Sequence, residues 1–230
     1  MEVELSEIAS GIQETVLISD EVLAFEGPNK PIELAAKRFL DLVVSSLLLL
    51  GVLPFFPIIA FLIYLDSRGP IFFKPRVIGY RGRQFDAYKF RTMHPDAFQR
   101  MLKDPELLHQ YKTTLKVQND PRITRIGRVL RKTSIDELPQ LINVLRGEMS
   151  LVGPRMLGQL ELDRFADHRG KILSVKPGMA GLWVASGRHN LSFEDRIRLE
   201  TEYVDNWSLW LDLKCFVKTL LIAVRAVGAQ

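Results

Sequence analysis

The chain lacks several residue types and motifs on which common enzymes depend. Cys215 is the only cysteine among 230 residues, so no intrachain disulfide can form and a reducing compartment is expected. There is no G-x-x-x-x-G-K-[ST] phosphate loop, no G-x-G-x-x-G dinucleotide turn and no G-x-S-x-G nucleophile elbow. The histidines show neither H-x-x-x-H spacing nor a cysteine partner, which argues against zinc; they are His94, His109, His168 and His189. The chemistry that remains is that of carboxylates, cations and a divalent ion such as Mg²⁺.

Basic residues are scarce only at the N-terminus. Residues 1–30 hold seven acids and one base, Lys30, whereas the rest of the chain holds thirty bases and twenty acids. The main part is therefore basic, and its expected partners are anionic: phosphates, anionic lipid or nucleic acid. The leader has no basic stretch followed by an apolar run, so it does not resemble a secretory signal, and Gly27–Pro31 has the composition of a linker. We expect residues 1–30 to form an acidic arm.

One long segment contains no charge: the 24 residues from Leu42 to Leu65. About 20 apolar residues cross the hydrocarbon core of a bilayer, so this segment is expected in a membrane. Pro54 and Pro57 lie near its middle, and a proline in a helix interior bends the axis and costs about 3 kcal/mol. Because both flanks are basic, the positive-inside tendency favours a helix-break-helix that enters and leaves by the cytoplasmic face. A kinked single span and a buried core helix of a soluble protein are the alternatives.

The segment that follows is expected to form short strands over Ile71–Arg91, with a turn at Arg81-Gly82. It carries seven bases and one acid between Arg68 and Arg91, which suits a juxtamembrane patch for lipid headgroups. In Y-K-F-R-T-M, however, aromatic and apolar residues alternate with Lys89 and Arg91, which favours a segment that packs as part of the folded domain.

The rest of the chain has the pattern of helices joined by turns. Helices are predicted over Met101–Lys116, Leu160–Phe165, from the cap Ser192-x-x-Asp195 onward, and over Trp207–Val227, with turns at Asp120–Arg122 and Lys176–Gly178. The last helix is amphipathic, with Trp207, Trp210, Lys214, Lys218 and Arg225 as interfacial residue types. Such a helix either lies in the headgroup plane or packs against the protein core.

The strongest chemical signal is the adjacent pair Asp136 and Glu137. The spacing Ser134-x-x-Glu137 is that of a capping box, so the acids are expected at the N-terminus of a helix. Pro139 predicts that this helix has an irregular first turn or begins later. Two acids in a first turn often do no more than favour the helix dipole.

The arginines around Asp136 and Glu137 favour a role in binding or chemistry for these two acids. Arginines recur at every third position upstream and return after the helix: Arg122, Arg125, Arg128, Arg131 and Arg155. Arginine suits bidentate phosphate binding, so acids among arginines indicate a phosphorylated substrate and a divalent cation. Arg188 follows Ser186-Gly187, a context that fits either a phosphate contact or a plain turn.

Several motifs together resemble the bacterial sugar transferases, which are monotopic polyprenol-phosphate phosphoglycosyl transferases. They are K-R-F-L-D before the apolar run, Y-K-F-R-T-M, the stretch from D-P-R-I-T-R to S-L-V-G-P-R, K-P-G-M-A-G-L-W and S-G-R. They follow in consistent order from about Lys37 to Val224. Two positions depart from the family pattern: Met156 stands where proline is usual, and Val184 where glutamine is common. These departures bear on the choice of sugar or nucleotide.

The resemblance implies transfer of a sugar 1-phosphate from a UDP-sugar to undecaprenyl phosphate with release of UMP, which starts exopolysaccharide, O-antigen or glycoconjugate synthesis. Asp136 would be the nucleophile that becomes a phosphosugar intermediate, and Glu137 would hold Mg²⁺ with it or orient it. The positions that match the family's substrate-binding residues are Arg131, Arg155 and Arg188, together with Lys89 and Arg91 in a motif of unspecified role. The implied location is the cytoplasmic face of the bacterial inner membrane, in contact with its lipids and not with nucleic acid, and a homodimer is compatible with it.

The expected fold is mainly α with short β strands (α+β). Four parts are predicted: an acidic arm at 1–30, a re-entrant membrane helix at 31–67, a cytoplasmic catalytic domain at 68–206 and an interfacial amphipathic helix at 207–230. Two other functions fit the charge: a membrane-anchored scaffold that recruits anionic lipid or proteins, and a nucleic-acid binder. The charge-free segment argues against the second.

Overall fold

The structure is a computed structural model of the chain, and it describes residues 25–114, 117, 119–187 and 191–225. The first elements are α3 (Pro31–Val52), the 3-10 helix η1 (Leu53–Phe55), α4 (Phe56–Asp66), β1 (Phe72–Phe73), β2 (Arg76–Ile78), η2 (Tyr80–Gly82), β3 (Gln84–Asp86), β4 (Lys89–Phe90), α5 (Ala97–Lys103) and α6 (Pro105–Thr114).

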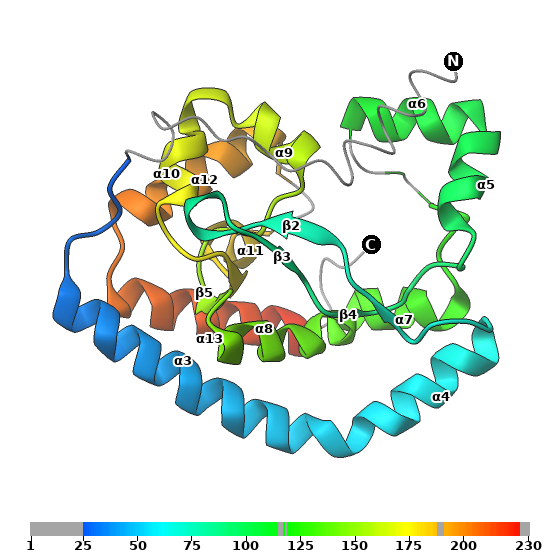
Figure 1. Cartoon of the computed structure of the whole chain (residues 1–230), viewed down its shortest axis with the longest axis horizontal. Helices are drawn as coiled ribbons and strands as arrows, with labels where there is room; N and C mark the ends of the chain where they lie inside the picture. The colour runs from blue at the N-terminus through cyan, green and yellow to red at the C-terminus, as the bar shows by residue number, and fades with distance from the viewer. Residues whose placement is uncertain (1–24, 115–116, 118, 188–190, 226–230) are drawn as a thin grey trace.

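The chain then continues through α7 (Arg125–Thr133), η3 (Ile135–Gln140), α8 (Leu141–Arg146), β5 (Ser150–Val152), α9 (Gln159–Arg164), η4 (Ala166–His168), α10 (Arg169–Leu173), β6 (Gly178–Ala180), α11 (Leu182–Ala185), α12 (Phe193–Asp205) and α13 (Leu209–Arg225). Helices predominate, and no strand in the described part exceeds three residues, so the expected fold class is confirmed (Figure 1). Most of the predicted acidic arm lies outside the described residues.

The charge-free segment forms two helices joined by one turn of 3-10 helix. Pro54 lies in the first turn of η1 and Pro57 in the first turn of α4. A proline is tolerated in a first turn because no intrahelical partner is needed for its missing N–H. The two prolines therefore begin new helical segments, and α3 and α4 bend into an arc below the rest of the molecule (Figure 1). The predicted break in the helix at the prolines is confirmed, while the return of the segment to the same membrane face stays a prediction.

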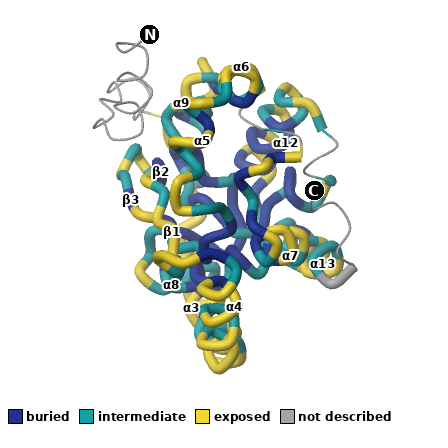
Figure 2. Tube along the Cα trace, turned by 90° about the vertical axis from the view of Figure 1, so that its right-hand side faces the viewer, coloured by how far each residue is buried: buried dark blue, intermediate teal, exposed yellow. Residues whose placement is uncertain are grey.

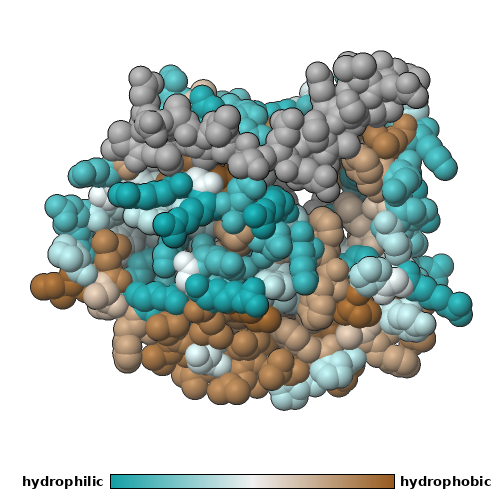
Figure 3. All heavy atoms as spheres, in the orientation of Figure 1, coloured by the Kyte–Doolittle hydropathy of each residue, from teal (hydrophilic) through white to brown (hydrophobic). Residues whose placement is uncertain are grey.

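The arc exposes apolar side chains. Seven of them are between 58% and 67% exposed: Phe39, Leu47, Leu50, Phe55, Ile58, Phe61 and Leu65. A hydrophobic band runs along the lower edge of Figure 3, where Figure 1 shows the arc, and both helices are largely exposed in Figure 2. The segment Pro31–Asp66 is long and apolar enough to cross a membrane, and only 11% of its most apolar window is buried. A buried core helix of a soluble protein is therefore excluded.

Both ends of the arc are bonded to the same body. Near the start of α3, Arg38 donates to the carbonyls at the C-terminus of α8, at 2.7 and 3.0 Å, and Asp41 accepts from the Leu151 amide at 3.0 Å. At the end of α4, Asp66 accepts from the Ile126 amide in α7 at 2.8 Å. The K-R-F-L-D motif thus fastens the membrane helix to the folded domain.

The strands form three two-stranded pairs. β1 pairs with β4 and β2 with β3, both antiparallel, while β5 and β6 are parallel. Arg81 and Gly82 adopt positive φ values in the turn between β2 and β3, as the sequence predicted.

The main core joins the short strands to α8, α12 and α13. Its buried members include Val77, Phe85, Leu141, Val144, Met149, Leu151, Tyr203, Val204, Trp207 and Cys215. The predicted cap of α12 is confirmed, because the Ser192 hydroxyl accepts from the Asp195 amide at 3.0 Å. Cys215 is buried as a small hydrophobic residue, and burial raises the pKa of its thiol to about 11.

Three expectations are corrected. The helix expected over Met101–Lys116 is divided at Asp104, whose carboxylate accepts from the first amides of α6 and begins a new helix. Trp207 is not an interfacial residue: it is 4% exposed and its indole donates to Asp212 at 3.3 Å. The third correction concerns Ser134 and belongs to the site.

Candidate active site

The two acids lie in a tight turn between α7 and α8. Ser134 has φ +57° and ends α7 in the left-handed region, and its side chain forms no cap, so the predicted capping box is wrong. The chain continues as the 3-10 helix η3, which contains Pro139, and regular α-helix begins only at Leu141. Pro139 has no N–H for an intrahelical bond, which explains the delayed start. Asp136 and Glu137 occupy the first turn of η3, and each is 8% exposed.

Glu137 is held by cations from two other segments of the chain. Lys89 in β4 donates to Oε1 at 3.2 Å. Arg155, three residues after β5, donates from Nη1 to Oε2 at 3.2 Å and from Nη2 to Oε1. This fork-to-fork pairing is the strong geometry of arginine and carboxylate. Lys89 and Arg155 thus meet at the Glu137 carboxylate, although they lie 48 and 18 residues from it in the sequence.

Asp136 lies within electrostatic range of Arg131 and Arg155. Burial lowers the pKa of Arg131, and the negative charges of Asp136 and Asp120 oppose that change. Burial also acts to lower the pKa of Arg155, but the carboxylates, chiefly Glu137, outweigh it, and the pKa of Arg155 is raised. Arg155 therefore stays charged despite burial, and the site concentrates positive charge around two acids.

Close backbone contacts set the position of Arg155. Gly178 donates its amide to the Pro154 carbonyl at 2.7 Å. A Cβ atom on Gly153 would lie 2.4 Å from the Lys176 carbonyl oxygen, and one on Gly178 would lie 2.1 Å from the Gly153 nitrogen. Only glycine permits this approach. The glycines of S-L-V-G-P-R and K-P-G-M-A-G therefore fix the turn that carries Arg155.

Another glycine sets the position of Arg131. A Cβ atom on Gly127 would lie 2.0 Å from the Thr92 carbonyl oxygen, so α7 packs directly against the Y-K-F-R-T-M segment. One turn later, Arg131 donates from Nε to the Thr92 hydroxyl at 2.9 Å. The charge of Arg131 interacts with those of Asp136, Asp120 and Glu137.

Other predicted cations lie elsewhere. Arg91 is buried and donates to the Ser67 carbonyl, and to its hydroxyl at 3.0 Å, at the end of the membrane arc. Arg122 is buried in an ion pair with Asp120 at 2.7 Å. Arg125 and Arg128 are exposed, and Arg188 lies outside the described residues. The structure thus brings Lys89, Arg131 and Arg155 to the acids and directs Arg91 to Ser67; the substrate-binding role of Arg91 stays a prediction.

Sequence reasoning missed Glu200 in α12. Its carboxylate accepts from the Arg155 backbone amide at 3.0 Å, and burial raises its pKa to about 7. A signal was present, because Glu200 lies three residues after Ile197 and three before Tyr203, on the apolar stripe of its helix. An acid on a buried helix face needs a partner, and the partner of Glu200 is the Arg155 amide.

A family model described as bacterial sugar transferase matches residues 32–226. The chain belongs to the bacterial sugar transferase family. The resemblance read from the motifs is thereby confirmed, and the match includes the membrane arc, both acids and the three cations around them.

Named relatives of this bacterial sugar transferase agree. The chain is 44% identical over 197 residues to the UDP-galactose-lipid carrier transferase of Erwinia amylovora, and 41% identical over 198 residues to the undecaprenyl-phosphate galactose phosphotransferase of Salmonella typhimurium. Each match covers 84% of this chain and 41% of the relative, so the chain spans less than half of those proteins. It is 42% identical over 200 residues to the exopolysaccharide production protein ExoY of Rhizobium meliloti, which covers 84% of this chain and 88% of ExoY.

The carboxylates of the site suit a metal ion that is also bound by the substrate better than one held by protein side chains alone. The described residues contain no group of three or more histidine, cysteine, aspartate or glutamate side chains that could hold a metal ion. Asp136 and Glu137 provide two carboxylates, of which that of Glu137 already accepts hydrogen bonds from Lys89 and Arg155. Mg²⁺ commonly binds through one or two carboxylates together with substrate phosphates. The residues therefore fit a magnesium ion that arrives with a diphosphate.

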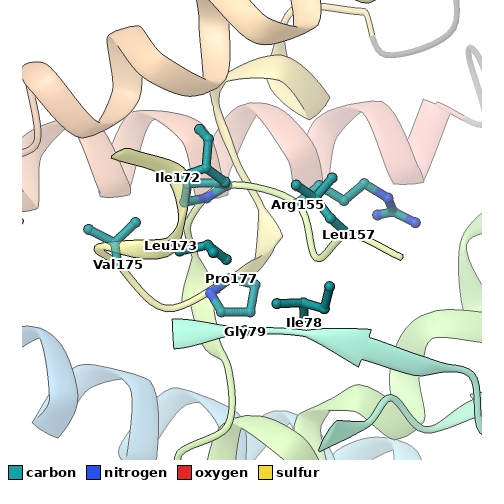
Figure 4. Close-up of a pocket in the computed structure, with 9 residues that line it drawn as sticks. Ile78, Gly79, Arg155, Leu157, Ile172, Leu173, Val175 and Pro177 are labelled. Atoms are coloured by element: carbon teal, nitrogen blue, oxygen red, sulfur yellow. The ribbon is translucent and has the colours of Figure 1, made fainter. Parts of the chain in front are cut away.

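A small cavity near Arg155 is not the site of the chemistry. Its volume is about 10 Å³, room for about one water molecule, and its lining is mainly apolar: Ile78, Leu157, Ile172, Leu173 and Val175 with neighbouring backbone. Figure 4 shows the Arg155 guanidinium extending away from this cluster.

Proposed function

We propose that this bacterial sugar transferase moves a sugar 1-phosphate from a UDP-sugar to a polyprenol phosphate such as undecaprenyl phosphate, and releases UMP. The observation that supports this most is the pairing of two buried carboxylates with Lys89, Arg131 and Arg155. The names of the relatives supply the lipid carrier and the exopolysaccharide context.

Asp136 is the nucleophile in this proposal. A carboxylate oxygen of Asp136 attacks the β-phosphorus of the donor, the bond from that phosphorus to the UMP oxygen breaks, and UMP leaves. An oxygen of the lipid phosphate then attacks the same phosphorus and displaces the Asp136 carboxylate. Both oxygens of Glu137 accept hydrogen bonds from cations, and in this proposal Glu137 helps to hold the metal or to orient Asp136.

The cations stabilise the charge on the phosphoryl group. Lys89, Arg131 and Arg155 come from three separate segments of the chain, and hydrogen bonds to the side chains of Glu137 and Thr92 hold them before substrate arrives. Such a preorganised arrangement lowers the energy of a charged transition state. We assign Arg188 the same role. Mg²⁺ held by Asp136, Glu137 and the diphosphate would supply further positive charge when bound.

The arc α3–α4 is re-entrant in this proposal. The apolar part of each arm is about 11 residues, or about 17 Å at 1.5 Å per residue, against a hydrocarbon core of about 30 Å. Arg38 and Asp66, near the two ends of the arc, both bond to the same folded body. Each arm therefore reaches about half-way across the bilayer and returns to the cytoplasmic face of the inner membrane, where a lipid phosphate would meet the site.

The last helix contacts the membrane surface in this proposal. One face of α13 packs on the core through Asp212 and Cys215, while Trp210, Leu213 and Leu220 are between 50% and 63% exposed. An apolar face of this kind suits the headgroup boundary.

The test uses the purified full chain in a lipid nanodisc with undecaprenyl phosphate, Mg²⁺ and a panel of UDP-sugars. Release of UMP together with sugar-phosphate transfer to the lipid is expected for one donor. Asp136→Asn should abolish both, while Asp163→Asn, which changes an exposed aspartate in α9, should leave both unchanged. Undiminished turnover in Asp136→Asn would refute the assignment of the nucleophile.

A further inference from the structure

Glu200 is buried against the turn that carries Arg155. It is 1% exposed, and its Oε1 accepts from the Arg155 amide at 3.0 Å. This amide lies outside the helices and strands, so a side chain provides its acceptor. The Arg155 side chain in turn forms the two-pronged pair with Glu137. One glutamate is thus connected through a single residue to the catalytic acids.

The same helix holds the other end of that turn. Tyr203, one helical turn after Glu200, lies with its hydroxyl 3.1 Å from the Val152 carbonyl and 2.7 Å from Asp212. Val152 ends β5, and Arg155 follows three residues later. Helix α12 therefore holds both ends of the turn, through Tyr203 at Val152 and through Glu200 at Arg155.

Packing alone does not explain a carboxylate at position 200. Within the described residues its Oε2 has no hydrogen-bond partner. A buried polar atom without a partner is destabilising, and an apolar side chain of similar volume would avoid that cost. The nearby charges are those of Arg155, Arg196 and Glu161, and the Cys215 thiol is a further titratable group close to it. What the Glu200 carboxylate provides, and an apolar side chain would not, is a hydrogen-bond acceptor for the Arg155 amide.

We propose that Glu200 is a positioning residue for the transfer reaction: by fixing the Arg155 amide, it aims the Arg155 guanidinium at Glu137 and at the phosphates of the donor. This inference rests on the proposed function. Glu200 acts through Arg155 and does not itself contact the reacting atoms.

Two variants separate the hydrogen bond from the charge. Glu200→Gln keeps an acceptor oxygen at the same place, and its turnover should stay close to that of the wild type. Glu200→Met keeps the volume and removes the acceptor, and its turnover should fall about 10–100-fold, the loss expected when a catalytic group is misplaced by about 1 Å. Glu202→Met, which changes an exposed glutamate in the same helix, is the matched control.

Hydrogen exchange of the Arg155 amide provides a readout independent of activity. The amide should exchange slowly in the wild type and in Glu200→Gln, and faster in Glu200→Met. If Glu200→Met does not fold, Glu200→Ala, in which a water can enter, replaces it with the same expectations. Unchanged exchange in the variant without the acceptor, or unchanged turnover despite faster exchange, would overturn the proposal.

The two proposals fail in different ways. If the wild type transfers no sugar phosphate from any donor while the Arg155 amide responds as predicted, the contact is real and the proposed function is wrong. If the wild type is active but Glu200→Gln is as impaired as Glu200→Met, the charge of Glu200 matters and not its hydrogen bond, and the positioning role is wrong.

Discussion

Replacing Arg155 by methionine separates two roles of its guanidinium. In the structure it pairs with Glu137, and in the proposed reaction it also holds the donor phosphates. Breaking a buried ion pair costs about 3–5 kcal/mol when the remaining charge is left alone. Lys89 still donates to Glu137 at 3.2 Å, so we expect a smaller loss of stability, about 2 kcal/mol.

A double-mutant cycle resolves the two roles. In a Glu137→Gln background the acid is neutral, so Arg155→Met should cost much less stability than it does in the wild type. The effect on turnover should persist, because the lost phosphate contact is worth about 100–1000-fold whether or not Glu137 is charged. The comparison is therefore between Glu137→Gln and the double variant.

The assay measures UMP release and the thermal unfolding midpoint in nanodiscs for the wild type, both single variants and the double variant. Arg198→Met is the control, because this side chain is 64% exposed and its ion pair with Asp195 lies at the surface, where such pairs contribute about 0–1 kcal/mol. Equal turnover in Glu137→Gln and the double variant would show that Arg155 serves only to neutralise Glu137, and the proposed phosphate contact would be refuted.

Three further predictions concern the support of the site. Gly127→Ala would place a methyl group 2.0 Å from a backbone carbonyl, so the unfolding midpoint should fall by the equivalent of at least about 1–3 kcal/mol, whereas Gly158→Ala, with open space around it, should change it little. Arg38→Met removes both hydrogen bonds to the end of α8 and should cost about 1.5–3 kcal/mol in the same melt, with Arg125→Met as the exposed control. Burial raises the pKa of Glu200 from 4.5 to about 7, so the stability contributed by its protonated form is complete below about pH 4.5 and lost as the pH rises through 7. The melting midpoint of the wild type minus that of Glu200→Gln should therefore fall between pH 5 and pH 8, and a flat difference would contradict the burial of a titrating acid.

Much of the fold could be predicted because the relevant signals are local. A charge-free run, two prolines near its middle and basic flanks define a bent apolar helix without reference to the rest of the chain. The turn at Arg81-Gly82 and the cap at Ser192 are likewise set by neighbouring residues. The pair Asp136 and Glu137 was identified from its setting among arginines.

The errors come from contacts between distant segments. Ser134 has the sequence spacing of a helix cap, but the chain must reverse there so that Glu137 can meet Lys89 and Arg155, and the residue adopts a positive φ instead. No local pattern shows that Arg91 turns to Ser67, 24 residues away. The regular spacing of arginines correctly indicated that Arg131 lies near the acids. It did not show that Arg125 and Arg128, in the same helix, are exposed to solvent.

The covalent intermediate is the central claim, and intact-protein mass spectrometry tests it most directly. The full chain, incubated with its UDP-sugar and Mg²⁺ but without lipid acceptor, should gain the mass of one sugar phosphate and release one equivalent of UMP. Fragmentation should place the added group on Asp136, and addition of undecaprenyl phosphate should remove it. Rapid transfer to the lipid with no mass gain under any single-turnover condition, or the same mass gain in Asp136→Asn, would contradict the mechanism.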